Sequence, residues 1–193
     1  MRIISGDAGG IPLKTVPGRA VRPTGDRVKE SLFSVIGDVS GAIVFDLFAG
    51  SGALGLEALS RGASQVIFVE KIKRHRQVIS HNLQSVRRAL PSDRTYETQI
   101  VGGNAVAVAK LFPAMARHVD LIFADPPYQP KRGEAGAADL IQNPSFQIWT
   151  SHAIVVLEHA AKTDLDFEGY GWDLLQNKRF GDTGVAFLRY SRP

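Results

Sequence analysis

A regular alternation of short apolar runs with segments of helical periodicity constrains the fold of this chain more than any other feature. Short apolar runs bounded by turn residues are typical of buried strands, and apolar residues three and four positions apart are typical of amphipathic helices. The predicted strands are Ala42–Asp46, Gln65–Glu70, Gln99–Val101, Val119–Asp125 and Ala153–Glu158. The predicted helices are Thr24–Ile36, Gly52–Arg61, a segment near 72–86, Ala105–Met115 and Ala135–Gln142. The alternation predicts an α/β, Rossmann-like fold with a mostly parallel, doubly wound sheet.

The two ends of the chain depart from this alternation. Near the C-terminus, Trp172–Lys178 and Thr183–Tyr190 are joined by Gly181-Asp182, which predicts an antiparallel edge hairpin. Residues 1–20 are Gly-rich with short apolar pieces and predict an N-terminal arm or hairpin extension. A chain of 193 residues supports one ordinary domain, which we place at 21–193.

Composition narrows the class of protein. Hydrophobic residues make up 44% and charged residues 22% of the chain, which is typical of a soluble globular protein. No apolar run is long enough to span a bilayer, and no signal peptide is evident. The absence of cysteine excludes disulfides, thiolate metal sites and a cysteine nucleophile, and it agrees with a cytoplasmic location. The histidines lack metal-ligand spacing, so no metal site is predicted, and a monomer is the default expectation.

Basic residues are concentrated in two stretches, although the net charge is only +4. The first lies in the N-terminal thirty or so residues, and the second runs from Lys71 to Arg88 without an acidic residue. A solvated helix face explains such a run as well as a nucleic-acid contact does. Two basic clusters in one small domain nevertheless permit contact with a phosphate backbone.

A glycine-rich loop joins the first predicted strand to its helix. Gly50, Gly52 and Gly55 satisfy the G-x-G-x-x-G pattern, and Glu70 ends the next strand twenty positions after Gly50. Glycines let a ligand approach the backbone closely, and the acid accepts hydrogen bonds from ribose hydroxyls. The pattern alone therefore allows a nicotinamide-dependent enzyme.

Asp46 argues for a different ligand. It ends the strand beside the loop, where a carboxylate would repel a diphosphate and attract an ammonium group. No downstream His or Tyr-Lys arrangement suggests hydride transfer. An acid for an ammonium and an acid for a ribose fit S-adenosylmethionine better than NAD.

A proline corner follows the strand Val119–Asp125. In Asp125-Pro126-Pro127-Tyr128 the two prolines stop the strand and remove two backbone donors just where a carboxylate emerges. The corner offers acceptors beside an aromatic ring, which suits a planar group that carries an NH2. A strand followed by a proline-rich turn is the simpler interpretation.

Together these residues resemble a known family. Asp46-Leu47-Phe48-Ala49-Gly50-Ser51-Gly52 resembles motif I of class I S-adenosylmethionine-dependent methyltransferases, and Asp125–Tyr128 resembles their amino-methyltransferase motif IV. The segment from Arg22-Pro23-Thr24 to Phe33, with the Met1-Arg2-Ile3-Ile4 start and Phe180–Thr183 near the end, is similar to the bacterial 16S ribosomal RNA guanine-N2 methyltransferase family. The resemblance covers almost the whole chain.

The resemblance implies roles for individual residues. Asp46 and the loop with Phe48, Ala49, Gly50, Ser51 and Gly52 would hold the methionine moiety, while Arg22 and Thr24 would lie near it. Glu70, with Lys71 beside it, would hold the ribose. Asn104 stands where the family usually has Asp; its amide oxygen would accept from the adenine amine and the Ala105 N–H would donate to the ring. Phe180 stands where a tyrosine is expected.

The implied reaction is methyl transfer to the N2 amine of a guanosine in 16S rRNA, within an assembled or partly assembled small subunit. Asp125 and a carbonyl near Pro126 would orient the amine, and Tyr128 would stack on a base removed from its helix. His159, at a strand end, is interpreted as a hydrogen-bonded structural residue. Three alternatives stay open: an adenine-N6 DNA methyltransferase, a nicotinamide oxidoreductase and a non-catalytic RNA-binding module.

Overall fold

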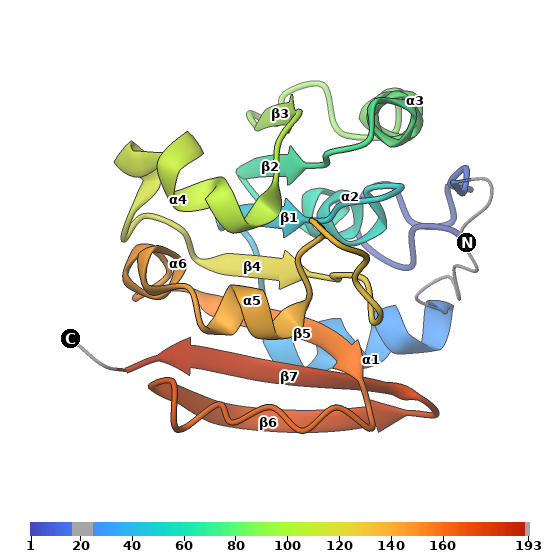
Figure 1. The fold of residues 1–193 in the computed structure, drawn as a ribbon. Coiled ribbons are helices and arrows are strands. Elements are labelled where there is room, and N and C mark those ends of the chain that lie inside the picture. The colour runs from blue at the N-terminus through green and yellow to red at the C-terminus, as the bar shows by residue number, and fades with distance from the viewer. Residues whose placement is uncertain (17–24, 192–193) are drawn as a thin grey trace. The chain divides into compact units, whose positions relative to one another are not determined.

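The computed structural model describes residues 1–16 and 25–191, drawn as a coloured ribbon in Figure 1. It divides into two compact units. The N-terminal unit comprises Met1–Gly102 and the C-terminal unit Gly103–Pro193. The predicted boundary after residue 20 falls outside the described residues and stays a prediction. In the part of the chain that the structure describes, no helix is long and apolar enough to cross a membrane.

The strands of the N-terminal unit are parallel and lie in the order β3-β2-β1. They are β1 (Ile43–Leu47), β2 (Gln65–Val69) and β3 (Glu97–Val101). Leu47 pairs with Val69, and Val69 with Val101, so the carboxyl ends of the three strands meet at one edge. The helices are α1 (Asp26–Ile36), α2 (Ala53–Ser60) and α3 (Lys73–Arg87); α2 packs on β1 and β2, and α3 on β3. This arrangement places the loop after β1 and the residue after β2 side by side.

A buried ion pair attaches the N-terminal arm to this unit. Lys29 Nζ of α1 lies 3.3 Å from Glu57 Oε2 of α2, and both side chains are fully buried. The Glu57 carboxylate also accepts the backbone N–H groups of Ile4 and Ser5, at 2.7 and 3.0 Å. Lys29 donates a second hydrogen bond to the carbonyl of Arg2. Residues of the arm are therefore held by charges that would be costly to leave unpaired.

The C-terminal unit contains four strands in the order β4-β5-β7-β6. They are β4 (Leu121–Ala124), β5 (Ile154–Ala160), β6 (Trp172–Phe180) and β7 (Thr183–Tyr190). β4 and β5 are parallel, whereas β7 is antiparallel to both β5 and β6. The parallel strands of both units and the antiparallel pair β6–β7 confirm the predicted doubly wound fold class with an antiparallel C-terminal edge.

One helix prediction in this unit was wrong, and one helix was not predicted. The segment Ala105–Met115 is not one helix but is divided into η1 (Ala105–Ala107), α4 (Val108–Leu111) and η2 (Pro113–Met115). Pro113 has no N–H to continue the helix, and Phe112 before it adopts an extended φ of −132°. The helix α6 (Pro144–Trp149), which follows α5 (Ala137–Ile141), was missed. Its sequence signal is Asn143, whose side chain accepts the N–H groups of Ser145 and Phe146.

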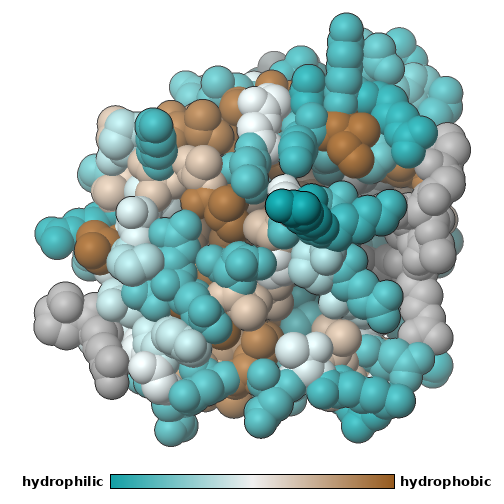
Figure 2. Space-filling view, in the orientation of Figure 1, coloured by the Kyte–Doolittle hydropathy of each residue, from teal (hydrophilic) through white to brown (hydrophobic). Residues whose placement is uncertain are grey.

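Each unit buries aromatic side chains of its own. Phe45 and Phe68 are fully buried in the N-terminal unit, and Phe123, Phe146 and Trp172 are buried in the C-terminal unit. The face drawn in Figure 2 is mainly hydrophilic, and its hydrophobic residues form small scattered groups. Buried side chains of this kind form the core of each unit.

Candidate active site

The glycine loop, Phe48–Gly52, turns the chain from β1 into α2 with backbone angles that side chains rarely adopt. Gly50 has a φ of 56° and Gly52 a φ of 77°. Phe48 also has a positive φ, of 60°, which is uncommon for a bulky residue and marks local strain. The Gly52 N–H donates to the Ala49 carbonyl at 2.6 Å and closes the turn. The loop therefore holds a tight, strained shape of the kind that functional sites retain.

Gly55 brings α2 unusually close to the sheet. A Cβ atom at this position would lie 2.5 Å from Cε1 of Phe68 and 3.1 Å from Cβ of Asp46. The close approach lets the Gly55 N–H donate to Asp46 Oδ2 at 2.9 Å. Asp46 is only 3% exposed, so its carboxylate is held at the helix start by the backbone.

Glu70 connects the glycine loop to the start of α3. Its Oε2 accepts the Gly50 N–H and its Oε1 accepts the Ile72 N–H, both at 2.8 Å. His75 Nδ1 lies 3.4 Å from Oε1, and the Glu70 residue is 5% exposed. A carboxylate has about four acceptor positions, so two N–H contacts leave capacity for hydroxyl donors. The sequence pattern predicted an acid here but not that it would also shape the loop.

Asn82 is a site-supporting residue that the sequence analysis missed. Its Nδ2 donates to the carbonyl of Ser51 in the loop and to that of Lys14 in the arm, both at 3.0 Å. Its Oδ1 accepts the Lys14 N–H at 2.8 Å, and the residue is 1% exposed. The available signal was its position: Asn82 lies three residues after Ile79 and next to Leu83, on the apolar stripe of α3, where a polar side chain needs a partner.

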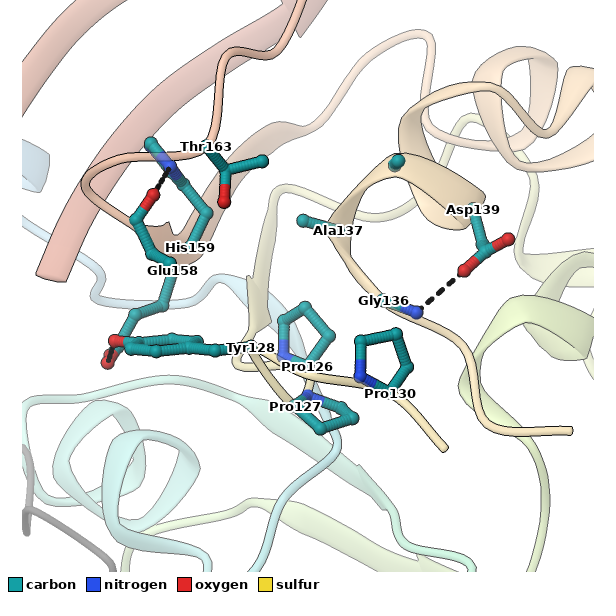
Figure 3. Close-up of a pocket in the computed structure, with 12 residues that line it drawn as sticks. Pro126, Pro127, Tyr128, Pro130, Gly136, Ala137, Asp139, Glu158, His159 and Thr163 are labelled. Carbon is teal, nitrogen blue, oxygen red and sulfur yellow. Dashed lines mark hydrogen bonds between the residues drawn. The ribbon is translucent and has the colours of Figure 1, made fainter. Parts of the chain in front are cut away.

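The proline corner, Asp125–Tyr128, begins where β4 ends. Asp125 is partly buried and Pro126 is buried, while Tyr128 is 40% exposed. The Tyr128 hydroxyl lies 2.6 Å from Glu158 Oε1 and 2.6 Å from Thr183 Oγ1. Figure 3 shows the ring beside Pro126 with its hydroxyl directed at Glu158. Two side chains from other strands therefore fix the orientation of an accessible aromatic ring.

The contacts with Glu158 and Thr183 determine the protonation state of the Tyr128 hydroxyl. A carboxylate only accepts, so the Tyr128 hydroxyl donates to Glu158 and the Thr183 hydroxyl donates to Tyr128. Burial, together with the hydrogen bond to Glu158, raises the pKa of Tyr128 well above its usual value. Tyr128 is thus a neutral phenol throughout the physiological range and supplies a ring rather than a base. The sequence analysis included Tyr128 but not Glu158 or Thr183 as its anchors.

His159 is hydrogen-bonded, in line with the structural role predicted for it. Its Nδ1 donates to the carbonyl of Ala160 at 3.0 Å, and burial lowers its pKa. The ring packs edge-on against Phe167 and over Gly184, where a Cβ would lie 2.5 Å from Cε1 of the imidazole. The residue is therefore a neutral part of the packing at the end of β5.

The other predicted site residues are distributed as follows. Asn104 is exposed, and its Oδ1 accepts the Val106 N–H at 3.3 Å, so it caps η1; Ala105 is buried. Arg22 and Thr24 lie outside the described residues. Lys71 is exposed after Glu70. Within the described ranges, no group of three His, Asp or Glu residues is placed to hold a metal ion. The assignment of all these residues to a ligand stays a prediction.

Comparisons with known proteins agree with the resemblance seen in the sequence. The family model described as "Conserved hypothetical protein 95" matches residues 1–189. The Bacillus subtilis protein named "Putative rRNA methyltransferase YlbH" is 37% identical over 98% of this chain and 98% of its own length. The Haemophilus influenzae protein named "Ribosomal RNA small subunit methyltransferase D" is 31% identical over 98% of this chain and 92% of its own. The structure titled "Putative methyltransferase yhhF from Escherichia coli" superposes with a TM-score of 0.70 at 28% identity, covering 100% of this chain and 99% of that one.

Proposed function

Because this chain belongs to the family described as Conserved hypothetical protein 95 and is similar over nearly its whole length to proteins named as rRNA methyltransferases, we propose that it methylates ribosomal RNA. The proposed reaction is transfer of a methyl group from S-adenosylmethionine to the N2 amine of a guanosine in 16S rRNA. The proposed substrate is an assembled or partly assembled small ribosomal subunit in the cytoplasm. The observation that carries the proposal is the Tyr128 ring fixed at the end of the Asp125-Pro126-Pro127 segment.

The N-terminal unit supplies the residues that would hold the cofactor. Asp46 and Glu70 are buried carboxylates at the ends of adjacent parallel strands, and the glycines between them let a ligand approach the backbone. Their acceptor oxygens suit an ammonium group and ribose hydroxyls, so the residues present fit the ligand. When bound, S-adenosylmethionine supplies an electrophilic methyl group on a positively charged sulfur.

The C-terminal unit supplies the residues that would hold the amine. The lone pair of an exocyclic guanine nitrogen is delocalised into the ring, so the amine is a poor nucleophile. Asp125 and the Pro126 carbonyl would accept its hydrogens and orient the lone pair outward. Because Pro126 and Pro127 fix φ and offer no N–H, these acceptors need little reorganisation when the substrate binds. Most of the rate would come from orientation and electrostatic placement.

Tyr128 would position the base that carries the amine. Its ring is restrained by Glu158 and Thr183 and is 40% exposed, so one flipped base can stack on it without first ordering the side chain. Stacking on an aromatic ring is worth about 1–3 kcal/mol per base. A neutral phenol avoids repulsion with a phosphate backbone.

The deciding experiment is methyl transfer from labelled S-adenosylmethionine to small subunits from cells that lack this gene, followed by mass spectrometry of the nucleosides. Label in N2-methylguanosine supports the proposal. Label in N6-methyladenosine retains the amine chemistry and overturns the guanosine assignment. Absence of label, with cofactor binding established by calorimetry, overturns the choice of the small subunit as substrate.

A further inference from the structure

The outer face of α3 carries positive charge with no negative charge next to it in the sequence. From Lys71 to Pro91 the chain has six lysines and arginines and no aspartate or glutamate. One face of the helix is buried in the N-terminal unit and is formed by His75, Ile79, Asn82, Leu83 and Val86. The opposite face, which we call the α3 stripe, is exposed and consists of Lys73, Arg74, Gln77, His81, Gln84 and Arg88. The stripe therefore has cations at both ends and amide and imidazole groups between them.

The cations of the α3 stripe have no carboxylate partner among the described residues. None of the ion pairs that these residues form includes Lys73, Arg74 or Arg88. Two neighbouring cations differ: Arg76 donates to two backbone carbonyls at the start of the helix, and Arg87 donates to a threonine of β3. Arg76 and Arg87 thus serve the fold, whereas the cations of the stripe face solvent.

Two cations of the stripe lie where the helix itself disfavours them. Lys73 and Arg74 begin α3, and the first turn of this helix contains no acidic residue. The N-terminal end of a helix carries a partial positive charge, which stabilises acidic side chains and repels basic ones. Helix stability therefore does not account for these cations, whereas an anionic partner outside the unit does.

The length of the stripe suits a polyanion better than a small anion. Arg74 and Arg88 are fourteen residues apart in the chain, which is about 21 Å along a helix. Successive phosphates of a duplex strand rise by about 3.4 Å along the axis, so several phosphates fit within this length. Glutamine side chains, such as those between the two cations, also donate to phosphate oxygens in nucleic-acid complexes.

We propose that the α3 stripe binds the phosphate backbone of the substrate RNA outside the target nucleotide. The inference rests on the proposed function for the identity of the polymer. The residues of the stripe are different from those assigned to the cofactor, the amine and the base. The stripe starts three residues after Glu70, so RNA bound along it would approach the edge of the sheet where the cofactor is proposed to bind. Phosphate contacts of this kind position a substrate without reading its sequence.

The test is the salt dependence of the affinity for isolated small subunits, measured by thermophoresis of fluorescently labelled enzyme. The variant Lys73→Gln/Arg74→Gln/Arg88→Gln should bind about tenfold more weakly at low salt. Its slope of log affinity against log salt should fall by about two, since each phosphate contact of a single strand contributes ~0.7. A slope equal to wild type would overturn the inference.

A matched control separates the stripe from the total charge of the protein. Lys110→Gln/Arg117→Gln/Arg189→Gln removes one lysine and two arginines from exposed positions of the C-terminal unit. This variant should keep the wild-type slope. An equal loss of slope in the control would show that only net charge matters and would also overturn the inference.

Protein-free 16S rRNA as a second probe identifies the partner of the stripe. If the stripe contacts phosphates, the slope should fall in the stripe variant with this probe as well. A fall confined to intact subunits would assign the stripe to an acidic protein surface and overturn the inference.

Thermal unfolding followed by circular dichroism tests whether the cations serve the fold instead. The stripe variant should unfold at the wild-type temperature or slightly above it, because charges that oppose the helix dipole have been removed. A lower unfolding temperature would contradict the inference. Affinity for S-adenosylmethionine should be unchanged. Because these are binding measurements, normal binding to subunits without formation of N2-methylguanosine would count against the proposed function alone.

Discussion

The glycine loop and the proline corner each form a rigid loop at the end of a parallel strand, but different kinds of hydrogen bond hold them. The glycine loop and the first turn of α2 are held through the backbone, because Glu70 accepts the Gly50 N–H and Asp46 accepts the Gly55 N–H. The proline corner has few N–H groups to hold, and its ring is fixed instead through the Tyr128 hydroxyl.

The sequence distances in the two sites differ accordingly. The partners in the glycine loop are 9 and 20 residues apart, whereas Tyr128 reaches 30 residues to Glu158 and 55 to Thr183. Local backbone contacts are expected to form with the loop itself. The ring at the corner depends on the whole C-terminal hairpin being in place. We therefore expect the two sites to respond differently to substitution.

The largest effect is expected at the corner, for Asp125→Ala. Loss of the acceptor that orients the amine should reduce methyl transfer by about 10²–10³-fold or more. Cofactor affinity, measured by calorimetry, should stay near wild type because that site lies on other residues. Asp93→Ala removes an exposed carboxylate and serves as the control. Full activity of Asp125→Ala would refute the assignment of the corner.

Lys29→Met tests whether the N-terminal unit also depends on distant partners. The substitution removes the lysine from the buried Glu57 carboxylate, which keeps Arg61 and two backbone N–H donors, so the expected cost is about 3 kcal/mol of the free energy of unfolding, the lower end for a broken buried pair. Urea unfolding followed by circular dichroism measures the loss. The double variant Lys29→Met with Glu57→Leu should be destabilised further, because Arg61 and the N–H groups of Ile4 and Ser5 then lose the Glu57 carboxylate as well. A single variant as stable as wild type would contradict the role of the ion pair.

Glu70→Ala tests whether Glu70 both holds the glycine loop and binds the cofactor. The Gly50 and Ile72 N–H groups would lose a charged acceptor, worth about 1.5–3 kcal/mol, and the ribose would lose its partner. We expect S-adenosylmethionine to bind about 10- to 100-fold more weakly by calorimetry. Glu97→Ala, at an exposed position of β3, is the matched control. Unchanged affinity would remove Glu70 from the cofactor site.

The smallest effect is expected for Thr183→Val, which removes one of the two anchors of Tyr128. A net hydrogen bond contributes about 1 kcal/mol, so kcat/KM for small subunits should fall about fivefold. Thr183→Ser keeps the hydroxyl and should restore most of the activity. If Val and Ser behave alike, the hydroxyl does not position the ring and only packing at the turn matters.

The glycine loop could be predicted from sequence because its features are either local or follow from the pairing of two consecutive parallel strands. Gly50, Gly52 and Gly55 require positive φ or close packing, and Asp46 and Glu70 end adjacent strands, which parallel pairing brings to one edge. The alternating strands and the closing hairpin were equally visible as periodic patterns. The helix predicted at Ala105–Met115 was wrong because Pro113 has no N–H with which to continue it.

Tertiary structure alone decided which distant side chains complete the sites. Nothing local to Tyr128 indicates Glu158 or Thr183, and nothing near Ser51 indicates Asn82, because these contacts depend on strand pairing and helix placement. The same holds for the cavity of about 150 Å³ beside the proline corner, whose lining comes from separated stretches of the C-terminal unit between Pro126 and Thr163. The sequence by itself determined the fold class and the positions of the two loops, since periodicity and backbone restriction are local properties. Side-chain contacts over long sequence separations form only when the chain has folded.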